Sequence, residues 1–188
     1  MDILDVLESE LTINDKLLAN LSTAELSHPT PCKEFDVGQL VAHMIAANTG
    51  LTGMTRGEAW QERPPAPDTP DDSPAARHLA SSEELMQALR ARDVFGETFD
   101  FGVVQMPGDV VLRQMVLEVV VHGWDLAKAT GQRRPIDPEL AAQLLVEAQA
   151  YDGARTPQGT PYGPAVEVPS SASPGDRLVG LHLGAAGG

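Results

Sequence analysis

The stretch "LEVVVHGWDLAKATG", residues 117–131, decides how this chain folds. It is rich in Val and Leu, and Glu118, His122 and Asp125 are set into it at spacings of four and three residues. These spacings place the three side chains on one face of an α-helix. With Asp109 as an N-cap and Gly131 after the last turn, the pattern predicts a long helix over about residues 110–130.

The polar residues of this helix form one stripe. At 100° per residue they fall within roughly a third of the circumference, and apolar residues fill the rest apart from Arg113. One interpretation is a buried helix with a single side facing water. Glu118 and His122 are then an ordinary surface pair worth a few tenths of a kcal/mol. The stripe consists of Gln114, Glu118, His122, Asp125 and Lys128.

The other interpretation turns the stripe toward the interior of a bundle or a cleft. A carboxylate and an imidazole one helical turn apart can bind the same divalent ion. The pattern E-x-x-x-H is common by chance, so a third ligand from another part of the chain is required. At this point both interpretations remain open.

The third ligand can be sought among the five histidines of the chain. His28, His78 and His182 lie in or beside loops and near the C-terminus, where surface positions are expected. His43 differs, because it lies at the margin of the buried face of a predicted helix over about residues 37–51, capped by Asp36. Small neighbouring alanines leave room there for a second helix or a ligand.

The rest of the chain also predicts helices joined by polar loops. A helix is expected over about residues 3–21, followed by a capping box at Ser22 and Glu25. The box Ser81-x-x-Glu84 predicts a third helix that reaches about residue 95. Later helices are expected after the caps Asp137 and Ser173. The sequence "FDFGVVQMPGD", residues 99–109, predicts a short extended segment.

These elements indicate an all-α protein, an up-and-down helical bundle with long loops, folded as a single domain over residues 1–188. The proline-rich stretch "RPPAPDTPDDSPA", residues 63–75, cannot bury a core face and predicts a surface loop. We expect the region from Gln61 to His78 to be the least ordered internal segment.

Composition narrows the possible functions. Hydrophobic residues make up 42% of the chain and the net charge is −14. This charge argues against a nucleic-acid partner and against anionic membrane surfaces. Cys32 is the single cysteine, which excludes an intrachain disulfide and a cysteine-rich zinc site. Without a signal-peptide pattern or an apolar run of about 18 residues, a cytoplasmic location is expected.

Three segments together resemble a known family. "TPCKEFDVGQLVAHM" (30–44), "EVVVHGWDLAKATG" (118–131) and "YGPAVEVPSSASPGDRL" (162–178) are similar, in order, to the mycothiol-dependent maleylpyruvate isomerase N-terminal domain family. That family belongs to the DinB-like helical bundles of metal-dependent enzymes. The resemblance covers most of the chain, and the histidine-bearing helix together with H-x-W-D-L-A-x-A-x-G is its most specific part.

The resemblance implies a four-helix bundle with one divalent metal ion, usually zinc, although nickel and iron remain open. Its ligands correspond to His43, Glu118 and His122. A thiol at the open metal position loses its proton near neutral pH and becomes a nucleophile. The implied partners are a small-molecule substrate and mycothiol or another low-molecular-weight thiol. The isomerase carries a further C-terminal domain, so transferase and isomerase chemistry both remain open.

Three further residues allow two interpretations each. Cys32 is a half-buried structural thiol or a thiol at the mouth of the metal site. Asp125 is a surface acid or a carboxylate that orients a ligand imidazole. Trp124 points away from the polar stripe and is expected in the core. The rival function is a non-catalytic bundle that binds a small apolar ligand or a protein partner, and a homodimer is compatible with either function.

Overall fold

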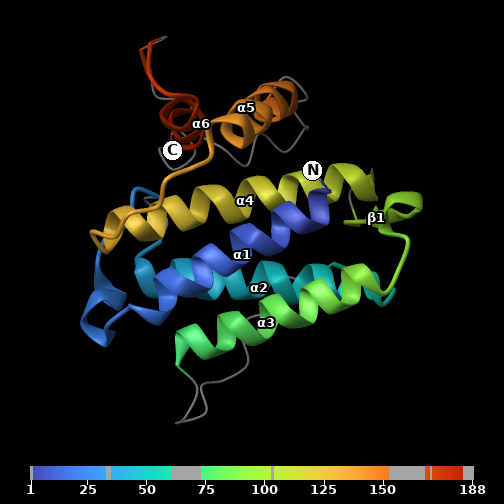
Figure 1. Ribbon diagram of the computed structural model, residues 1–188. Helices are drawn as coiled ribbons and strands as arrows, with labels where there is room; N and C mark the ends of the chain where they lie inside the picture. The colour runs from blue at the N-terminus through green and yellow to red at the C-terminus, as the bar shows by residue number, and fades with distance from the viewer. Residues whose placement is uncertain are drawn as a thin grey trace.

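Six α-helices dominate the described residues of the computed structural model (Figure 1). The structure describes residues 2–32, 35–60, 73–102, 104–152, 168–169 and 171–183, with the backbone alone for 150–152 and 181–183. The helices are α1 (Ile3–Ala19), α2 (Val37–Thr55), α3 (Pro74–Arg90), α4 (Gly108–Ala129), α5 (Pro138–Asp152) and α6 (Pro174–Leu183), with 3-10 turns η1 (Thr23–Ser27) and η2 (Val94–Gly96) and strands β1 (Thr98–Asp100) and β2 (Gln105–Pro107).

The predicted all-α four-helix bundle is confirmed. Helix α1 packs against α3 and α4, and α2 packs against the same two helices. Helices α5 and α6 pack on each other and lie beyond α4, on the side away from α2 and α3 (Figure 1). Four helices therefore enclose the main core, and α4 has neighbours on two sides.

The contacts between α2 and α3 give the direction of these helices. Asn48 of α2 donates a hydrogen bond to Ser81 of α3. Further toward the C-terminus of both helices, Arg56 of α2 donates to Glu84 of α3. Residue numbers thus rise together, so α2 and α3 run in the same direction. The end of α2 at Thr55 and the start of α3 at Pro74 therefore lie at opposite ends of the bundle.

Several predicted helix boundaries are confirmed by their caps. The Asp36 carboxylate accepts the N–H of Gln39, whose side chain bonds back to Asp36, and α2 begins directly after this box. Gly131 has φ +67°, in the left-handed region that ends helices at glycine. Asp137 accepts the N–H groups of the first turn of α5, and Ser173 does the same for α6.

Two predicted helix starts are wrong. Helix α3 begins two turns before the predicted box at Ser81, because Ser73 accepts the N–H of Ala76 and Pro74 occupies the first helical position. Helix α4 begins at Gly108, so Asp109 lies in its first turn and is not the N-cap. There its carboxylate still interacts favourably with the helix dipole.

The predicted extended segment is a small antiparallel hairpin. Strands β1 and β2 pair Thr98 with Pro107 and Phe99 with Met106. Phe99 is buried, while the ends of both strands are exposed. Gly108 follows the hairpin directly and donates its N–H to the carbonyl of Glu97. The hairpin thus closes one end of the bundle and leads into α4.

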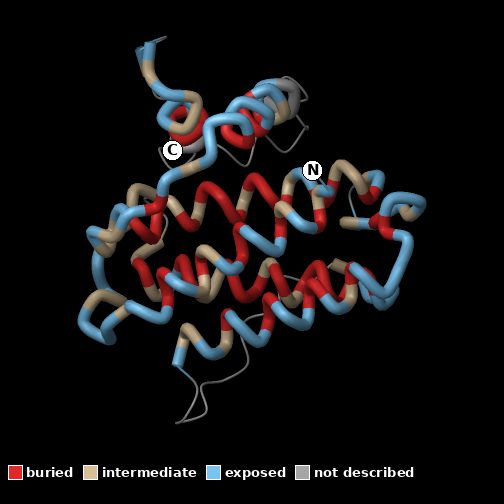
Figure 2. The backbone as a smooth tube through the Cα atoms, in the orientation of Figure 1, coloured by how far each residue is buried: buried red, intermediate tan, exposed pale blue. Residues whose placement is uncertain are grey.

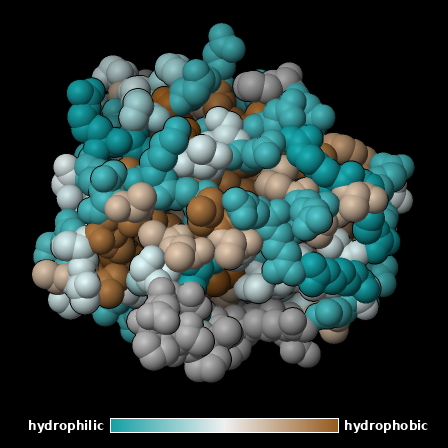
Figure 3. Space-filling model, turned by 60° about the horizontal axis from the view of Figure 1, so that its bottom comes forward, coloured by the Kyte–Doolittle hydropathy of each residue, from teal (hydrophilic) through white to brown (hydrophobic). Residues whose placement is uncertain are grey.

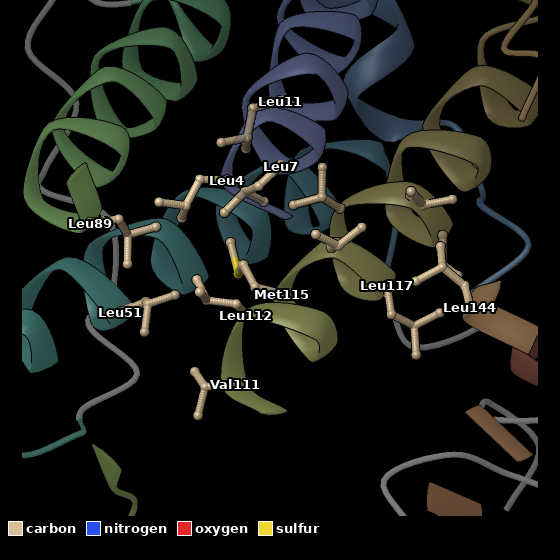
Figure 4. Close-up of a cluster of buried hydrophobic side chains, with 14 of the residues drawn as sticks. Leu4, Leu7, Leu11, Leu51, Leu89, Val111, Leu112, Met115, Leu117 and Leu144 are labelled. Atoms are coloured by element: carbon tan, nitrogen blue, oxygen red, sulfur yellow. The ribbon is translucent and has the colours of Figure 1, made fainter. Parts of the chain in front are cut away.

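Buried residues lie mainly on the facing sides of the helices (Figure 2), and most of the residues in the core are aliphatic. Leu4, Leu7 and Leu11 of α1 point toward Leu112 and Met115 of α4 (Figure 4). A fully buried leucine stabilises the fold by about 1.5–3 kcal/mol. A second cluster fills the other end of the bundle and includes Leu17, Leu18, Val37, Leu40 and Leu126.

The net charge of −14 favours a hydrophilic surface. On the face shown in Figure 3, polar residues surround smaller hydrophobic areas. None of the helices in the described ranges combines the length and the apolar character that crossing a membrane requires. Most of the expected proline-rich loop, residues 61–72, lies outside the described residues.

A buried polar network attaches α1 to α4 behind the polar stripe. The Asn14 side chain donates to the carbonyl of Val119 at 2.9 Å, and Arg134 donates to Asn14 and, at 2.6 Å, to Glu10. This approach requires glycine at position 123, because a Cβ there would lie 2.0 Å from Asn14 Oδ1 and 2.5 Å from Arg134 Nε.

We therefore expect Gly123→Ala to lower the free energy of unfolding by about 1–3 kcal/mol, since the new methyl group displaces Asn14 and Arg134. Urea denaturation followed by circular dichroism measures this change. Gly175→Ala is the control, because its Cβ would meet Ile136 at an ordinary 3.6 Å. Equal stability of the two variants would contradict the close approach.

Candidate metal centre

Helices α2 and α4 bring three predicted site residues together. His43 comes from α2, and Glu118 and His122 come from successive turns of α4. One ligand atom from each lies within 4.8 Å of the other two, the only such group of three His, Cys, Asp or Glu residues in the described part of the chain. The polar stripe of α4 thus meets the margin of α2, as the interior interpretation requires.

Aromatic packing holds the His43 ring. Phe35, just before α2, stacks on it with centroids 5.1 Å apart and planes 26° apart. On the other side, His122 meets His43 edge to face, with centroids 5.0 Å apart and an interplanar angle of 83°. The imidazole of His43 is therefore enclosed between two rings, which limits the orientations open to its nitrogens.

Each nitrogen of His122 faces a carboxylate. Nε2 lies 2.9 Å from Glu118 Oε2, and Nδ1 lies 3.5 Å from Asp125 Oδ2. The Asp125 side chain is only 4% exposed and that of His122 is 14% exposed. Asp125 is therefore no surface acid, and Glu118–His122 is no ordinary exposed pair.

The two carboxylates control the charge of His122. Burial alone lowers the pKa of His122, because it penalises the charged imidazolium. The two nearby carboxylates, Glu118 at 2.9 Å and Asp125 at 3.5 Å, outweigh burial and raise the pKa of His122 from 6.5 to about 9. At neutral pH His122 consequently carries a proton on the nitrogen that faces Glu118.

Trp124 was expected in the core and is only partly buried. Its ring lies under the Lys128 ammonium group, 5.1 Å from the ring centroid. The apolar side of α4 extends to the protein surface near the C-terminal end of the helix. Trp124 lies at this border, where it makes a cation–π contact with Lys128.

A cavity of about 10 Å³ is lined in part by His43, Glu118 and His122. A volume of this order holds about one water molecule or one small ion. Its walls combine the polar cluster with apolar side chains and with His78 of α3. The lining residues are His43, Met44, Ala47, Asn48, His78, Met115, Glu118, Val119 and His122.

The prediction that His78 lies on the surface is wrong. His78 is 1% exposed, and its Nδ1 lies 2.6 Å from Asp15 Oδ1 of α1. The early start of α3 turns His78 inward, and a buried imidazole then requires a polar partner. The signal was present, because Ser73-Pro74 is the same cap and first-position pair as Asp137-Pro138.

A second missed group surrounds His78. Asn48 of α2 donates to Ser81 and Ser82 of α3, at 3.0 and 3.3 Å, and all three residues are buried. Ser82 also lies 3.4 Å from His78 Nδ1. Helical spacing alone could not identify these residues, because they form a network only where α1, α2 and α3 meet.

His28 and Cys32 do not belong to the cluster of His43, Glu118 and His122. His28 is exposed, as expected, and the side chain of His182 is outside the described residues. Cys32 is half-buried in the loop before α2, where its carbonyl accepts the N–H of Phe35 and the Thr30 hydroxyl. The role of Cys32 at the mouth of the site stays a prediction.

Comparison with known proteins agrees with the resemblance seen in the sequence. The family model of the mycothiol maleylpyruvate isomerase N-terminal domain matches residues 7–127, from the second turn of α1 to near the end of α4, and so includes His122 and Asp125. Two uncharacterized proteins of Mycobacterium tuberculosis, from strains CDC 1551 / Oshkosh and ATCC 25618 / H37Rv, are each 32% identical over 164 residues. Each match covers 86% of this chain and 86% of the relative.

Two solved structures share the fold. The crystal structure of the mycothiol-dependent maleylpyruvate isomerase matches with a TM-score of 0.65 at 18% identity, over 86% of this chain and 73% of that chain. A structure of a histidine-to-alanine mutant of that isomerase matches equally well. At 18% sequence identity, this similarity shows that the two proteins share a fold.

The raised pKa of His122 predicts how stability depends on pH. A histidine with a higher pKa in the folded state stabilises the fold fully below its unfolded pKa of 6.5, and loses that contribution as pH rises to about 9. Without metal, the unfolding free energy should therefore fall by at most about 3 kcal/mol across this window.

Urea denaturation at pH 6, 7.5 and 9 measures this change. His122→Gln should make the unfolding free energy less dependent on pH. His28→Gln, which alters an exposed histidine, should leave the pH dependence of the wild type unchanged. A wild-type stability that is constant from pH 6 to 9 would show that the two carboxylates do not hold a proton on His122.

Proposed function

Because this chain belongs to the mycothiol maleylpyruvate isomerase N-terminal domain family, we propose that it binds one divalent metal ion and uses a low-molecular-weight thiol to act on a small molecule. His43, Glu118 and His122 are the proposed ligands. The observation that carries the proposal is the convergence of their ligand atoms within 4.8 Å on the inner sides of α2 and α4.

The chemistry of the donor set fits a divalent ion. Two imidazoles and one carboxylate are a combination that binds zinc in catalytic sites and leaves a position open. The same donors accept nickel and iron, so zinc is the first expectation for the ion. Nε2 of His122 faces Glu118 across 2.9 Å, and a cation at this place would replace the proton that the pair now shares.

The neighbouring residues have supporting roles in this proposal. Nδ1 of His122 and Oδ1 of Asp125 are buried without a hydrogen-bond partner, while Oδ2 of Asp125 lies 3.5 Å from Nδ1. A small shift would join Asp125 to the ring and fix His122 with Nε2 toward the ion. Phe35 would hold His43 in place and exclude water from one side.

A bound metal ion would lower the pKa of a thiol at its open position and so favour the nucleophilic thiolate. Mycothiol is the first candidate because of the family, and other low-molecular-weight thiols are alternatives. The reaction class is thiol-dependent transfer or isomerisation, with Cys32 at the mouth of the site. We also propose that the protein is cytoplasmic and that residues 1–188 fold as one helical bundle domain.

The rival function, a non-catalytic bundle that binds a small apolar ligand or a protein partner, receives less support from the cluster. A cavity of about 10 Å³ can take only one terminal atom of an organic ligand, so an apolar molecule would bury little of its surface there. Its two histidines and one carboxylate are also unsuited to an apolar occupant.

Metal binding is tested with protein purified without a histidine tag. We expect one zinc ion per chain by inductively coupled plasma mass spectrometry. Zinc at a hundredfold excess over its dissociation constant should raise the unfolding free energy by about 2.7 kcal/mol, because the ion binds only the folded state.

His122→Ala and His43→Ala should abolish both the bound zinc and the stabilisation. His28→Ala is the matched control, since His28 is exposed and outside the cluster. Equal stabilisation of wild type and His122→Ala by zinc would refute this site and favour the non-catalytic bundle.

A further inference from the structure

The Asp15–His78 pair reaches the same cavity from the opposite helices. Asp15 is on α1 and His78 is on α3, whereas the three proposed metal ligands are on α2 and α4. His78 lines the cavity beside His43, Glu118 and His122. All four helices of the bundle therefore place a polar residue at or directly behind one small space.

The contact with Asp15 orients the protons of His78. Nδ1 lies 2.6 Å from Asp15 Oδ1. An ionised carboxylate can only accept a hydrogen bond, so the proton of this bond belongs to Nδ1. In the neutral ring Nε2 then carries a lone pair, and no hydrogen bond to it is found within the described residues. This is the arrangement by which a carboxylate prepares a histidine to accept a proton.

A purely structural role would leave this arrangement unexplained. Helices α1 and α3 are already joined at the surface by Arg90 with Asp5 and Glu8, and Nε2 of His78 takes no part in joining them. The network of Asn48, Ser81 and Ser82 engages the Nδ1 side of His78 and its backbone carbonyl. Nε2 is the group that this network omits.

We infer that His78 is the proton acceptor for the thiol that enters this cavity, and that Asp15 is the residue that positions it. The S–H bond breaks, the electron pair remains on sulfur, and the proton binds Nε2 of His78. The resulting imidazolium is stabilised by the Asp15 carboxylate, so the step needs no further reactant. The inference rests on the proposed function, because it assigns the ligand of this cavity as a thiol.

The first test requires no metal. Two-bond proton–nitrogen correlation spectra at pH 8 report which nitrogen of each histidine is protonated. We expect the Nδ1–H form for His78 in the wild type, and a larger share of the Nε2–H form in Asp15→Asn. Asp5→Asn, which alters an exposed carboxylate on the same helix, should leave His78 unchanged. Predominant Nε2 protonation in the wild type would overturn the inference.

The second test counts protons when 2-mercaptoethanol binds the zinc-loaded protein. Titration calorimetry in two buffers of different ionisation enthalpy measures the protons released. The wild type should release almost none, because His78 retains the thiol proton. His78→Phe and Asp15→Asn should release up to one proton per thiol, or bind the thiol at least about tenfold more weakly. Asp5→Asn should behave as wild type.

The outcomes separate the two proposals. A wild type that binds no zinc refutes the proposed metal function, while the metal-free spectra still decide the state of His78. A wild type that binds zinc and thiol, but with the same proton release and the same thiol affinity as both variants, overturns the role of His78. If His78→Phe fails to fold, Asp15→Asn preserves the shape of the pair and alone decides the result.

Discussion

The fold depends on a compensated polar stripe inside the bundle. Glu118, His122 and Asp125 lie on the side of α4 that faces α2, where an unpaired charge would be strongly destabilising. They reduce this cost by sharing a proton among themselves, as the raised pKa of His122 indicates. The arrangement is therefore stable without an ion, and its geometry does not have to be created when one binds.

The opposite side of the same turns is fixed by α1. Asn14 bonds the carbonyl of Val119, which lies between Glu118 and His122 in the chain, and Arg134 approaches over Gly123. Asp15, the next residue of α1, holds His78. Two adjacent residues of α1 therefore contact both neighbouring helices: Asn14 bonds α4 near Glu118 and His122, and Asp15 bonds His78 of α3. Helix α1 thus connects the two sets of residues.

Sequence patterns predicted the elements better than their relative positions. Caps such as Asp36 and Asp137 act within a few residues, and Glu118 and His122 share a face through helical geometry alone, so these features follow from local spacing. The meeting of His43 with that pair depends on how α2 packs on α4, and only the family resemblance indicated it. His78 was missed because one misplaced helix start moved it to the surface, and its partner Asp15 lies 63 residues away.

The size of the cavity connects the packing with the proposed chemistry. Space for about one water molecule lies between the ligand cluster and His78. A single bound atom can therefore contact both walls, and a larger molecule must keep its remaining atoms outside. A thiol meets this condition, because its reactive sulfur is terminal and its carbon skeleton can extend outward. The walls also differ in chemistry: the carboxyl group of Glu118 suits a cation beside it, whereas Nε2 of His78 suits a proton donor. In the proposed function the metal ion would lie among the ligand atoms of His43, Glu118 and His122, and the cavity would take the thiol sulfur alone, between that ion and His78.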